Sequence, residues 1–215
     1  MKGLKKLNVI CIMIVGLILG GCSTQKPINP EDLVTPDVQE PEQLPIATIE
    51  VESFGTIKAE LYPHLAPNTV NNFISLANSG FYDNVIIHRI EKDFVLQAGD
   101  PTGVGSGGPG YSIAGEFAVN GFNNELLHTK GVLSMARTNE PDSAGSQFFI
   151  MLEDAPHLDG QYASFGKVVE GIEVAEAIEA VELTAGTSKP ATDVVINKIS
   201  VETFGETYDE PNIIE

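Results

Sequence analysis

The arginines of this chain are the side chains whose type and placement most suggest chemistry. Beyond residue 22 there are seven lysines but only two arginines, Arg89 and Arg137. Arg89 lies in the otherwise apolar run Val85–Ile90. A planar guanidinium can make a fixed set of hydrogen bonds, whereas an exposed cation could equally be a lysine. Two interpretations of Arg89 stay open on this pattern alone: a functional hydrogen-bond donor, or a strand arginine paired with one of the thirty acidic residues.

Other catalytic and ligand-binding patterns are weakly represented. The histidines are widely spaced, so they indicate neither a zinc site nor a serine-histidine-aspartate triad: His64, His88, His128 and His157. Residues 103–108 match the dinucleotide pattern Gly-x-Gly-x-x-Gly, but Pro109 and Gly110 follow, so no helix begins there to receive a pyrophosphate. We expect a flexible, tightly turning loop at this position, no metal and no cofactor.

The charge and cysteine content exclude two classes of protein. Thirty Asp and Glu face 12 Lys and Arg, which gives a net charge of −18. Such a surface repels phosphate backbones, so nucleic-acid binding through a basic face is not expected. The only cysteines are Cys11 and Cys22. The rest of the chain can therefore contain neither a disulfide framework nor a cysteine metal site.

The N-terminus has the features of an export signal. Lysines at positions 2, 5 and 6 precede an apolar stretch over residues 9–20, which is too short for a permanent transmembrane helix. The sequence Leu19-Gly20-Gly21-Cys22 resembles the bacterial lipoprotein box. This resemblance implies that residues 1–21 are a signal peptide and that Cys22 carries a diacylglyceryl anchor on the extracytoplasmic face of the cell membrane. The alternative is an ordinary secretory signal with a chance cysteine.

Three segments follow the predicted anchor. Residues 22–45 are rich in proline and acidic residues, which favours an extended spacer. Residues 46–204 form the expected folded domain, and residues 205–215 form an acidic tail that we expect to be loose. No internal repeat is present in the sequence.

The domain pattern predicts strands with two helices. Apolar residues alternate on both sides of a turn at Ser53–Gly55, which indicates an opening hairpin. Short apolar runs predict the other strands: 85–90, 94–96, 131–136, 147–152, 165–169 and 194–201. Helical spacing of apolar residues predicts helices over 67–78 and 172–181. The expected architecture is mainly β, a closed antiparallel β-barrel capped by two α-helices.

Residues 88–100 make a family resemblance recognisable. They read HRIEKDFVLQAGD and are similar to the cyclophilin signature F-H-R-x-x-x-x-F-x-x-Q-x-G-D, with Ile87 in place of the leading phenylalanine. Further blocks resemble the family in order: 131–136, 145–150, 158–160 and 165–168. The resemblance implies a peptidyl-prolyl cis-trans isomerase on an eight-stranded antiparallel barrel with two helices.

The resemblance also implies roles for individual residues. Arg89 would be the catalytic residue, donating a hydrogen bond to the prolyl nitrogen in the twisted transition state, and Gln97 would support it. A wall that receives the proline ring would be made of Phe94, Val95, Phe148 and Leu158. Three further positions would run along the bound peptide: Ala136, Arg137 and Gln147. Because side chains alternate along a strand, Phe149 is expected in the barrel core. By the same alternation, His88 is expected on the face opposite to Arg89, as an interior histidine with satisfied hydrogen bonds.

Two substrate-binding positions depart from many eukaryotic members of that family. His157 stands where those members have tryptophan, and Tyr162 stands where they have histidine. Loss of the indole removes a donor and a large apolar face, which predicts weakened cyclosporin binding. Tyr162 can still supply a hydroxyl group at the rim of the pocket.

Two functions remain open at this stage. The first is an active isomerase that acts on proline-containing segments of secreted proteins as they fold outside the cytoplasmic membrane. The second is a chaperone or adhesion module that binds proline peptides, with incidental turnover. The arginine–glutamine pair favours the enzyme, because a binding module needs the pocket but not the pair. We expect a monomer attached to the membrane through Cys22, with no nucleic-acid partner.

Overall fold

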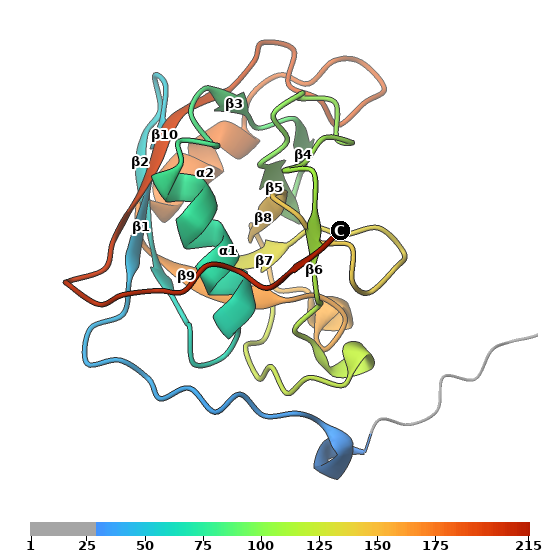
Figure 1. Cartoon of the computed structure of the whole chain (residues 1–215). Coiled ribbons are helices and arrows are strands. Elements are labelled where there is room, and N and C mark those ends of the chain that lie inside the picture. Colours follow the sequence, from blue (N-terminus) through green and yellow to red (C-terminus); the bar gives the residue numbers. More distant parts are fainter. Residues whose placement is uncertain (1–28) are drawn as a thin grey trace, which may run out of the picture.

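The structure, a computed structural model, describes residues 29–215. It contains one large curled sheet, a small two-stranded sheet and two α-helices (Figure 1). The predicted signal peptide and the predicted lipid anchor at Cys22 lie outside the described residues. Neither helix within residues 29–215 is both long enough and apolar enough to cross a membrane.

The large sheet has nine antiparallel strands in the order β3-β10-β1-β2-β9-β7-β8-β5-β4. Its strands are β1 (Ile46–Val51), β2 (Gly55–Leu61), β3 (Val85–Ile86), β4 (Arg89–Glu91), β5 (Val95–Ala98), β7 (Val132–Met135), β8 (Phe148–Met151), β9 (Ser164–Glu170) and β10 (Val195–Glu202). The sheet curls into a half-barrel. The mainly β fold with two helices is therefore confirmed, but the expected closed barrel of eight strands is wrong.

The apolar run at residues 85–90 accounts both for the ninth strand and for the two unpaired edges of the sheet. This run was expected to form one strand, but its pairing partner changes halfway along. β3 pairs with β10, and Ile87 still donates its backbone N–H to the carbonyl of Val194. One residue later, His88 donates to the carbonyl of Gln97, and β4 pairs with β5. The run thus connects the two edges of the sheet without a ladder between β3 and β4.

The helices and the opening hairpin agree closely with the sequence pattern. β1 and β2 pair around a turn in which Ser53 has a positive φ of 64° and Gly55 one of 124°. α1 (Pro67–Asn78) has the predicted bounds, and α2 (Ile172–Glu179) ends two residues earlier than expected. Apolar side chains on α1 enter the main core, which holds Phe73 at the centre of a cluster of aromatic rings.

The first turn of α1 is capped from a distant loop. Ala66 at the N-cap offers no side-chain acceptor. Buried Glu116 instead accepts hydrogen bonds from the backbone N–H groups of Asn68 and Thr69, at 2.9 and 2.8 Å, and from the Thr69 hydroxyl at 2.6 Å. These bonds satisfy N–H groups that lack partners within the helix. The cap ties the helix to the segment that follows β6 (Ser112–Ile113).

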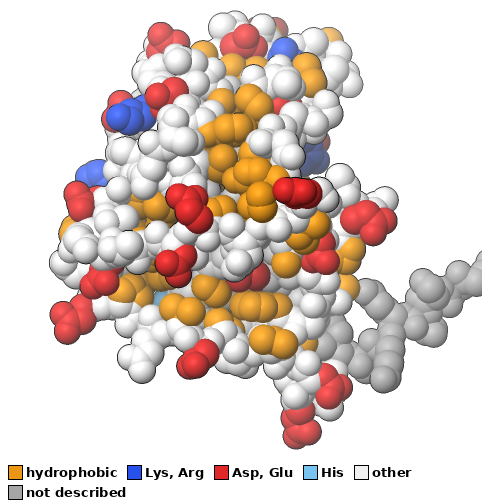
Figure 2. Space-filling view, in the orientation of Figure 1, with side chains coloured by type: hydrophobic (Ala, Val, Ile, Leu, Met, Phe, Trp, Pro, Cys, Tyr) orange, Lys and Arg blue, Asp and Glu red, His pale blue; other side chains and the backbone are white. Residues whose placement is uncertain are grey.

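Both extensions of the domain lie against its surface. The expected loose tail is wrong, because β11 (Ile213–Ile214) pairs with β6 and Asn212 exchanges two hydrogen bonds with the Asn68 side chain. In the predicted spacer, Val34 forms an isolated β-bridge with Phe122, a short way after the helix Pro30–Asp32. Most side chains of the described part of the spacer are exposed. Figure 2 shows one face of the described residues, with scattered acidic side chains and few basic ones.

Candidate active site

A cavity of about 150 Å³ opens at the surface where β4, β5 and β8 meet the helical turn Pro156–Leu158. It is lined by Arg89, Phe94, Val95, Gln97, Ala136, Arg137, Phe149, Leu158 and Tyr162. All of these residues except Phe149 belong to the set expected from the sequence. We call this space the proline-sized cavity, because its volume and mostly apolar wall fit a small ring.

Phe148, expected in the wall of the cavity, instead lies in the main core. The strand register gives the reason. Phe149 is paired directly with Gln97 on β5 and with Ser134 on β7, whereas Phe148 is paired with Ala98. Paired residues share a face of the sheet, and successive residues alternate between faces. Phe149 therefore shares the face of Gln97, and the two adjacent phenylalanines have the opposite placement to the one predicted.

Arg89 lies at the edge of the proline-sized cavity and is held on two sides. One terminal nitrogen donates to the Gln97 Oε1 at 3.1 Å, and the other pairs with the Glu91 carboxylate at 3.2 Å. Glu91 also accepts a hydrogen bond from Ser188. The two interpretations of this arginine are thus both present in the geometry, because it is paired with an acid and faces an aromatic-walled cavity. Its side chain remains partly exposed to solvent.

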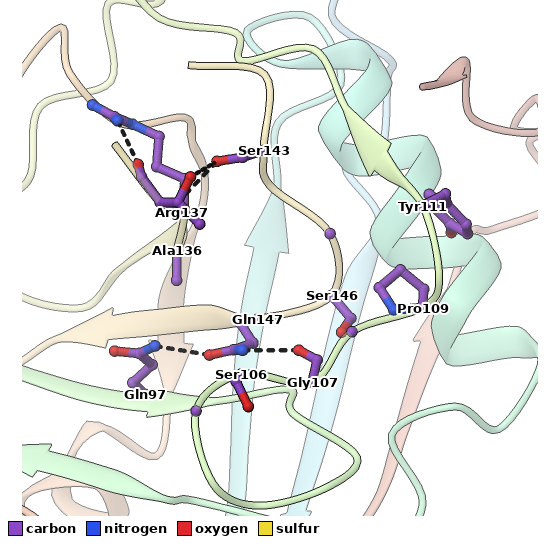
Figure 3. Close-up of a pocket in the computed structure, with 14 residues that line it drawn as sticks. Gln97, Ser106, Gly107, Pro109, Tyr111, Ala136, Arg137, Ser143, Ser146 and Gln147 are labelled. Carbon is purple, nitrogen blue, oxygen red and sulfur yellow. Dashed lines mark hydrogen bonds between the residues drawn. The ribbon is translucent and has the colours of Figure 1, made fainter. Parts of the chain in front are cut away.

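A chain of hydrogen bonds leads from Arg89 to a second cavity. Gln97 donates from its amide to the Gln147 Oε1 at 3.0 Å, and Gln147 donates to the carbonyl of Gly107 at 2.9 Å (Figure 3). Gln147 lies in the second cavity and does not line the proline-sized one. The second cavity, of about 280 Å³, is lined by Gln97, Gly105, Ser106, Gly107, Gly108, Pro109, Tyr111, Ala136, Arg137, Thr138, Ser143, Gly145, Ser146 and Gln147.

The glycine-rich loop beside the second cavity is anchored by a buried carboxylate. Asp100 accepts hydrogen bonds from the hydroxyl and backbone N–H of Thr102, both at 2.7 Å, and from the backbone of Val104 and Gly105. Burial raises the pKa of Asp100, but these hydrogen bonds outweigh it and hold the pKa well below its ordinary value. The loop expected to be flexible thus has an internal anchor, which the sequence reasoning missed although Asp100 ends the recognised signature.

The wall of the proline-sized cavity is supported from behind by a second unpredicted group. His128 lies between Asp159 and Ser134, with its Nδ1 3.0 Å from the carboxylate and its Nε2 2.9 Å from the hydroxyl. Its ring stacks on Phe149 at 6.2 Å between centroids. Burial lowers the pKa of His128, and the hydrogen bond to Asp159 opposes that effect only in part. An imidazole held in place by these two contacts therefore packs behind the aromatic wall.

The other two histidines near the site differ in their surroundings. His88 is buried on the face opposite to Arg89, as expected, but neither of its ring nitrogens has a hydrogen-bond partner among residues 29–215. The prediction of a satisfied interior histidine was therefore wrong. His157 is exposed, does not line the proline-sized cavity and stacks on Phe94 at 5.8 Å between centroids. It extends the aromatic surface beyond the cavity.

The arrangement offers a positioned cation beside an apolar cavity. No group of three or more His, Cys, Asp and Glu side chains that could hold a metal ion occurs within residues 29–215. The geometry can bind a small apolar ring, donate hydrogen bonds from the guanidinium of Arg89 and accept or donate at the amide of Gln97. These are groups for binding and electrostatic stabilisation.

Comparison with known proteins identifies relatives over most of the chain. The family profile for cyclophilin-type peptidyl-prolyl cis-trans isomerases matches residues 46–201. The peptidyl-prolyl cis-trans isomerase CYP18-2 of Arabidopsis thaliana is 44% identical over 158 residues, which cover 73% of this chain and 93% of the relative. The peptidyl-prolyl cis-trans isomerase B of Bacillus subtilis is 48% identical over 126 residues, covering 59% and 85%.

The fold also matches a solved structure. A cyclophilin-type peptidyl-prolyl cis-trans isomerase of Cryptosporidium parvum, crystallised in the presence of the dipeptide Ala-Pro, aligns with a TM-score of 0.67 and 34% identity. The alignment covers 74% of this chain and 99% of that one.

Proposed function

Because the chain belongs to the cyclophilin-type family and is a peptidyl-prolyl cis-trans isomerase, we propose that Arg89 is its catalytic hydrogen-bond donor. An X–Pro bond resists rotation because the nitrogen lone pair is shared with the carbonyl, and the barrier is roughly 18–20 kcal/mol. At the twisted transition state this sharing is lost. The prolyl nitrogen then becomes a hydrogen-bond acceptor that the planar form does not offer.

The position of Arg89 supports this role. Its contacts to Gln97 and Glu91 use some of its five N–H donors, and the side chain still borders the proline-sized cavity. A donor that is already held in place stabilises charge without a cost of reorganisation when the reaction occurs. Since the bond to nitrogen forms only in the twisted state, it lowers the barrier and does not merely bind the substrate.

The apolar wall would hold the proline ring while the rest of the peptide rotates. Val95, Phe149 and Leu158 form one apolar cluster, with Phe94 packed against it. Gln97, placed between the arginine and Gln147, would hold the peptide backbone on the carbonyl side. The observation that carries the proposal is the single cavity in which this cluster and the Arg89 guanidinium meet.

An Arg89→Ala variant tests the proposal. We expect kcat/KM for an X–Pro test peptide to fall by at least about a hundredfold, a typical cost of removing one transition-state donor. Lys58→Ala is a matched control, because it also removes a partly exposed cation from an ion pair, with Glu170 on β9. A folded Arg89→Ala variant with the rate of the control would remove Arg89 from this role. Full rescue by Arg89→Ala in cells would instead favour the proline-peptide-binding function.

We also propose that the enzyme acts outside the cytoplasmic membrane, held there by a lipid at Cys22. The proposal is supported by the apolar stretch at residues 9–20 and the small residues that precede the cysteine. Its substrates would be proline-containing segments of secreted proteins, bound by a monomer. Cys22→Ser should release the protein from the membrane or leave it unprocessed, whereas Cys11→Ser should change neither. Normal cleavage with unchanged membrane retention in Cys22→Ser would contradict the anchor.

A further inference from the structure

The second arginine, Arg137, makes contacts that differ from those expected of a substrate-binding residue. Its Nε and Nη2 both donate to the carbonyl of Gln161, at 2.9 and 2.8 Å, and its Nη1 donates to the carbonyl of Thr138 at 2.8 Å. In Figure 3 its side chain extends away from Gln147. Most of its hydrogen-bonding capacity is therefore used within the protein, although the residue borders both cavities.

The guanidinium of Arg137 also lies over two aromatic rings. Its central carbon is 5.0 Å from the ring centroid of Phe117 and 4.6 Å from that of Tyr162. Both distances lie within the range of cation–π attraction. The side chain thus joins three segments that are far apart in the sequence, which contain residues 117, 138 and 161–162. Only a flat, delocalised cation can stack on rings while its edge donates to carbonyls.

Tyr162 is the part of this assembly that lies in the proline-sized cavity. Its ring meets Phe149 edge-on, with 5.9 Å between centroids and an interplanar angle of 80°. His128 lies against another edge at 6.4 Å. Within the described part of the chain, no hydrogen bond involves the Tyr162 hydroxyl. The ring is therefore fixed by Arg137 and its aromatic neighbours, while the hydroxyl remains available to a bound peptide.

We propose that Arg137 is a positioning residue that fixes Tyr162 at the rim of the proline-sized cavity, and that it acts through this ring without contacting the peptide through its guanidinium. The inference rests on isomerase activity at this cavity but not on the role of Arg89. The inference predicts that the planar shape of the Arg137 guanidinium matters, and that its charge alone is not sufficient. A lysine would keep the charge but lose both the stacking and the forked hydrogen bonds.

A double-mutant cycle tests this inference. The variants are Arg137→Gln, Tyr162→Leu and the two combined, measured for KM and kcat on an Ala-Pro test peptide and for peptide affinity. Arg137→Gln should raise KM by about 3- to 10-fold, the size expected for a lost cation–π pair, with kcat within about twofold. The double variant should be no weaker than Tyr162→Leu, because the arginine acts only through that ring. Additive effects would overturn the inference.

The lysine variant separates shape from charge. Under the proposal Arg137→Lys should behave like Arg137→Gln. If Arg137→Lys has wild-type KM, the charge attracts the peptide and the inference is wrong. Lys58→Gln serves as the control for loss of a cation elsewhere on the sheet.

A measurement on the unmodified protein keeps the inference testable if these variants fold poorly. The Arg137 Nε–H signal in NMR spectra should exchange slowly with water and stay protected when a saturating proline peptide is added. Loss of protection on binding would show that the guanidinium leaves Gln161 for the peptide, which would overturn the proposal. The coupling between Arg137 and Tyr162 can also be measured from peptide affinities in an Arg89→Ala background, where no turnover is needed. Failure of the catalytic role of Arg89 can therefore be distinguished from failure of this inference.

Discussion

The opposite placement of two adjacent phenylalanines can be tested by replacing each with leucine. Phe148 is almost fully buried and meets Phe73 and Tyr82 edge-on, at 5.4 and 5.7 Å between centroids. Phe149 points from the other face of β8 into the proline-sized cavity. Leucine is apolar at either position. The two variants therefore differ in which ring contacts they remove.

Phe148→Leu should reduce stability and leave activity almost unchanged. Each edge-to-face aromatic pair contributes about 0.5–1.5 kcal/mol beyond its buried area, so losing two costs about 1–3 kcal/mol. A loss of about 2 kcal/mol lowers Tm by about 4–8 °C in a domain of this size. Because the ring does not reach the cavity, kcat/KM measured well below Tm should stay within about twofold of wild type.

Phe149→Leu should lower activity in addition to stability, because leucine also removes the ring contacts with His128 and Tyr162. It removes the flat wall against which the proline ring would lie, and loss of about 1.4 kcal/mol of transition-state binding lowers kcat/KM about tenfold. Thermal melts followed by circular dichroism and a coupled isomerase assay measure both quantities on the same samples. If Phe148→Leu loses activity at unchanged stability while Phe149→Leu remains active, the assignment of faces from the strand register is wrong.

Two further predictions concern buried titratable groups. Asp100→Asn should speed backbone hydrogen exchange of residues 101–108 by more than about tenfold. The reason is that an amide cannot accept all the loop hydrogen bonds that the carboxylate accepts. Unchanged exchange would contradict the role of Asp100 as the anchor of the loop. Burial lowers the pKa of His88 and His128, so the native state binds fewer protons than the unfolded chain below about pH 6.5. The free energy of unfolding should therefore fall on acidification, by up to about 1.4 kcal/mol per pH unit for each histidine. His88→Gln should flatten this profile in urea titrations and exposed His157→Gln should not; equal slopes would refute the reasoning.

The predicted elements match best where local patterning and tertiary packing agree. α1 has its expected bounds because Pro67 suits a first turn and its apolar stripe faces the core. The strand count was wrong because periodicity reports which side chains are buried, and it does not report which neighbour a backbone pairs with. Residues 85–90 read as one apolar run, yet the partner changes from β10 to β5 between Ile87 and His88.

The tail shows a different limit of sequence reasoning. Residues 205–215 are acidic and contain few apolar side chains, a composition that favours disorder. Their docking depends on an exposed pairing edge at β6 and on the Asn68 side chain, which imitates a strand partner for Asn212. Neither feature can be seen in the tail itself. The anchor at Asp100 was missed for a similar reason, since most of its partners are backbone N–H groups.

The sequence predicted most residues that line the proline-sized cavity, but it missed Phe149. Three residues expected at the site do not line this cavity: Phe148, Gln147 and His157. The sequence block 147–150 contains two successive phenylalanines, and both positions are apolar, so alternation alone cannot say which one faces the core. Only the register with Gln97 fixes the answer. The scarcity of arginine drew attention to Arg89 but left its two interpretations open, and the structure contains the features of both.

The structure shows two different uses of arginine beside one cavity. Arg89 is bound by side-chain acceptors, Gln97 and Glu91, and remains partly exposed to solvent at the cavity. Arg137 donates to backbone carbonyls, and its guanidinium lies over the rings of Phe117 and Tyr162. A side chain that must interact with a changing substrate needs free donors, whereas one that holds a loop in place needs satisfied ones. The distinction supports the two proposed roles, in which Arg89 acts in catalysis and Arg137 holds Tyr162 in place.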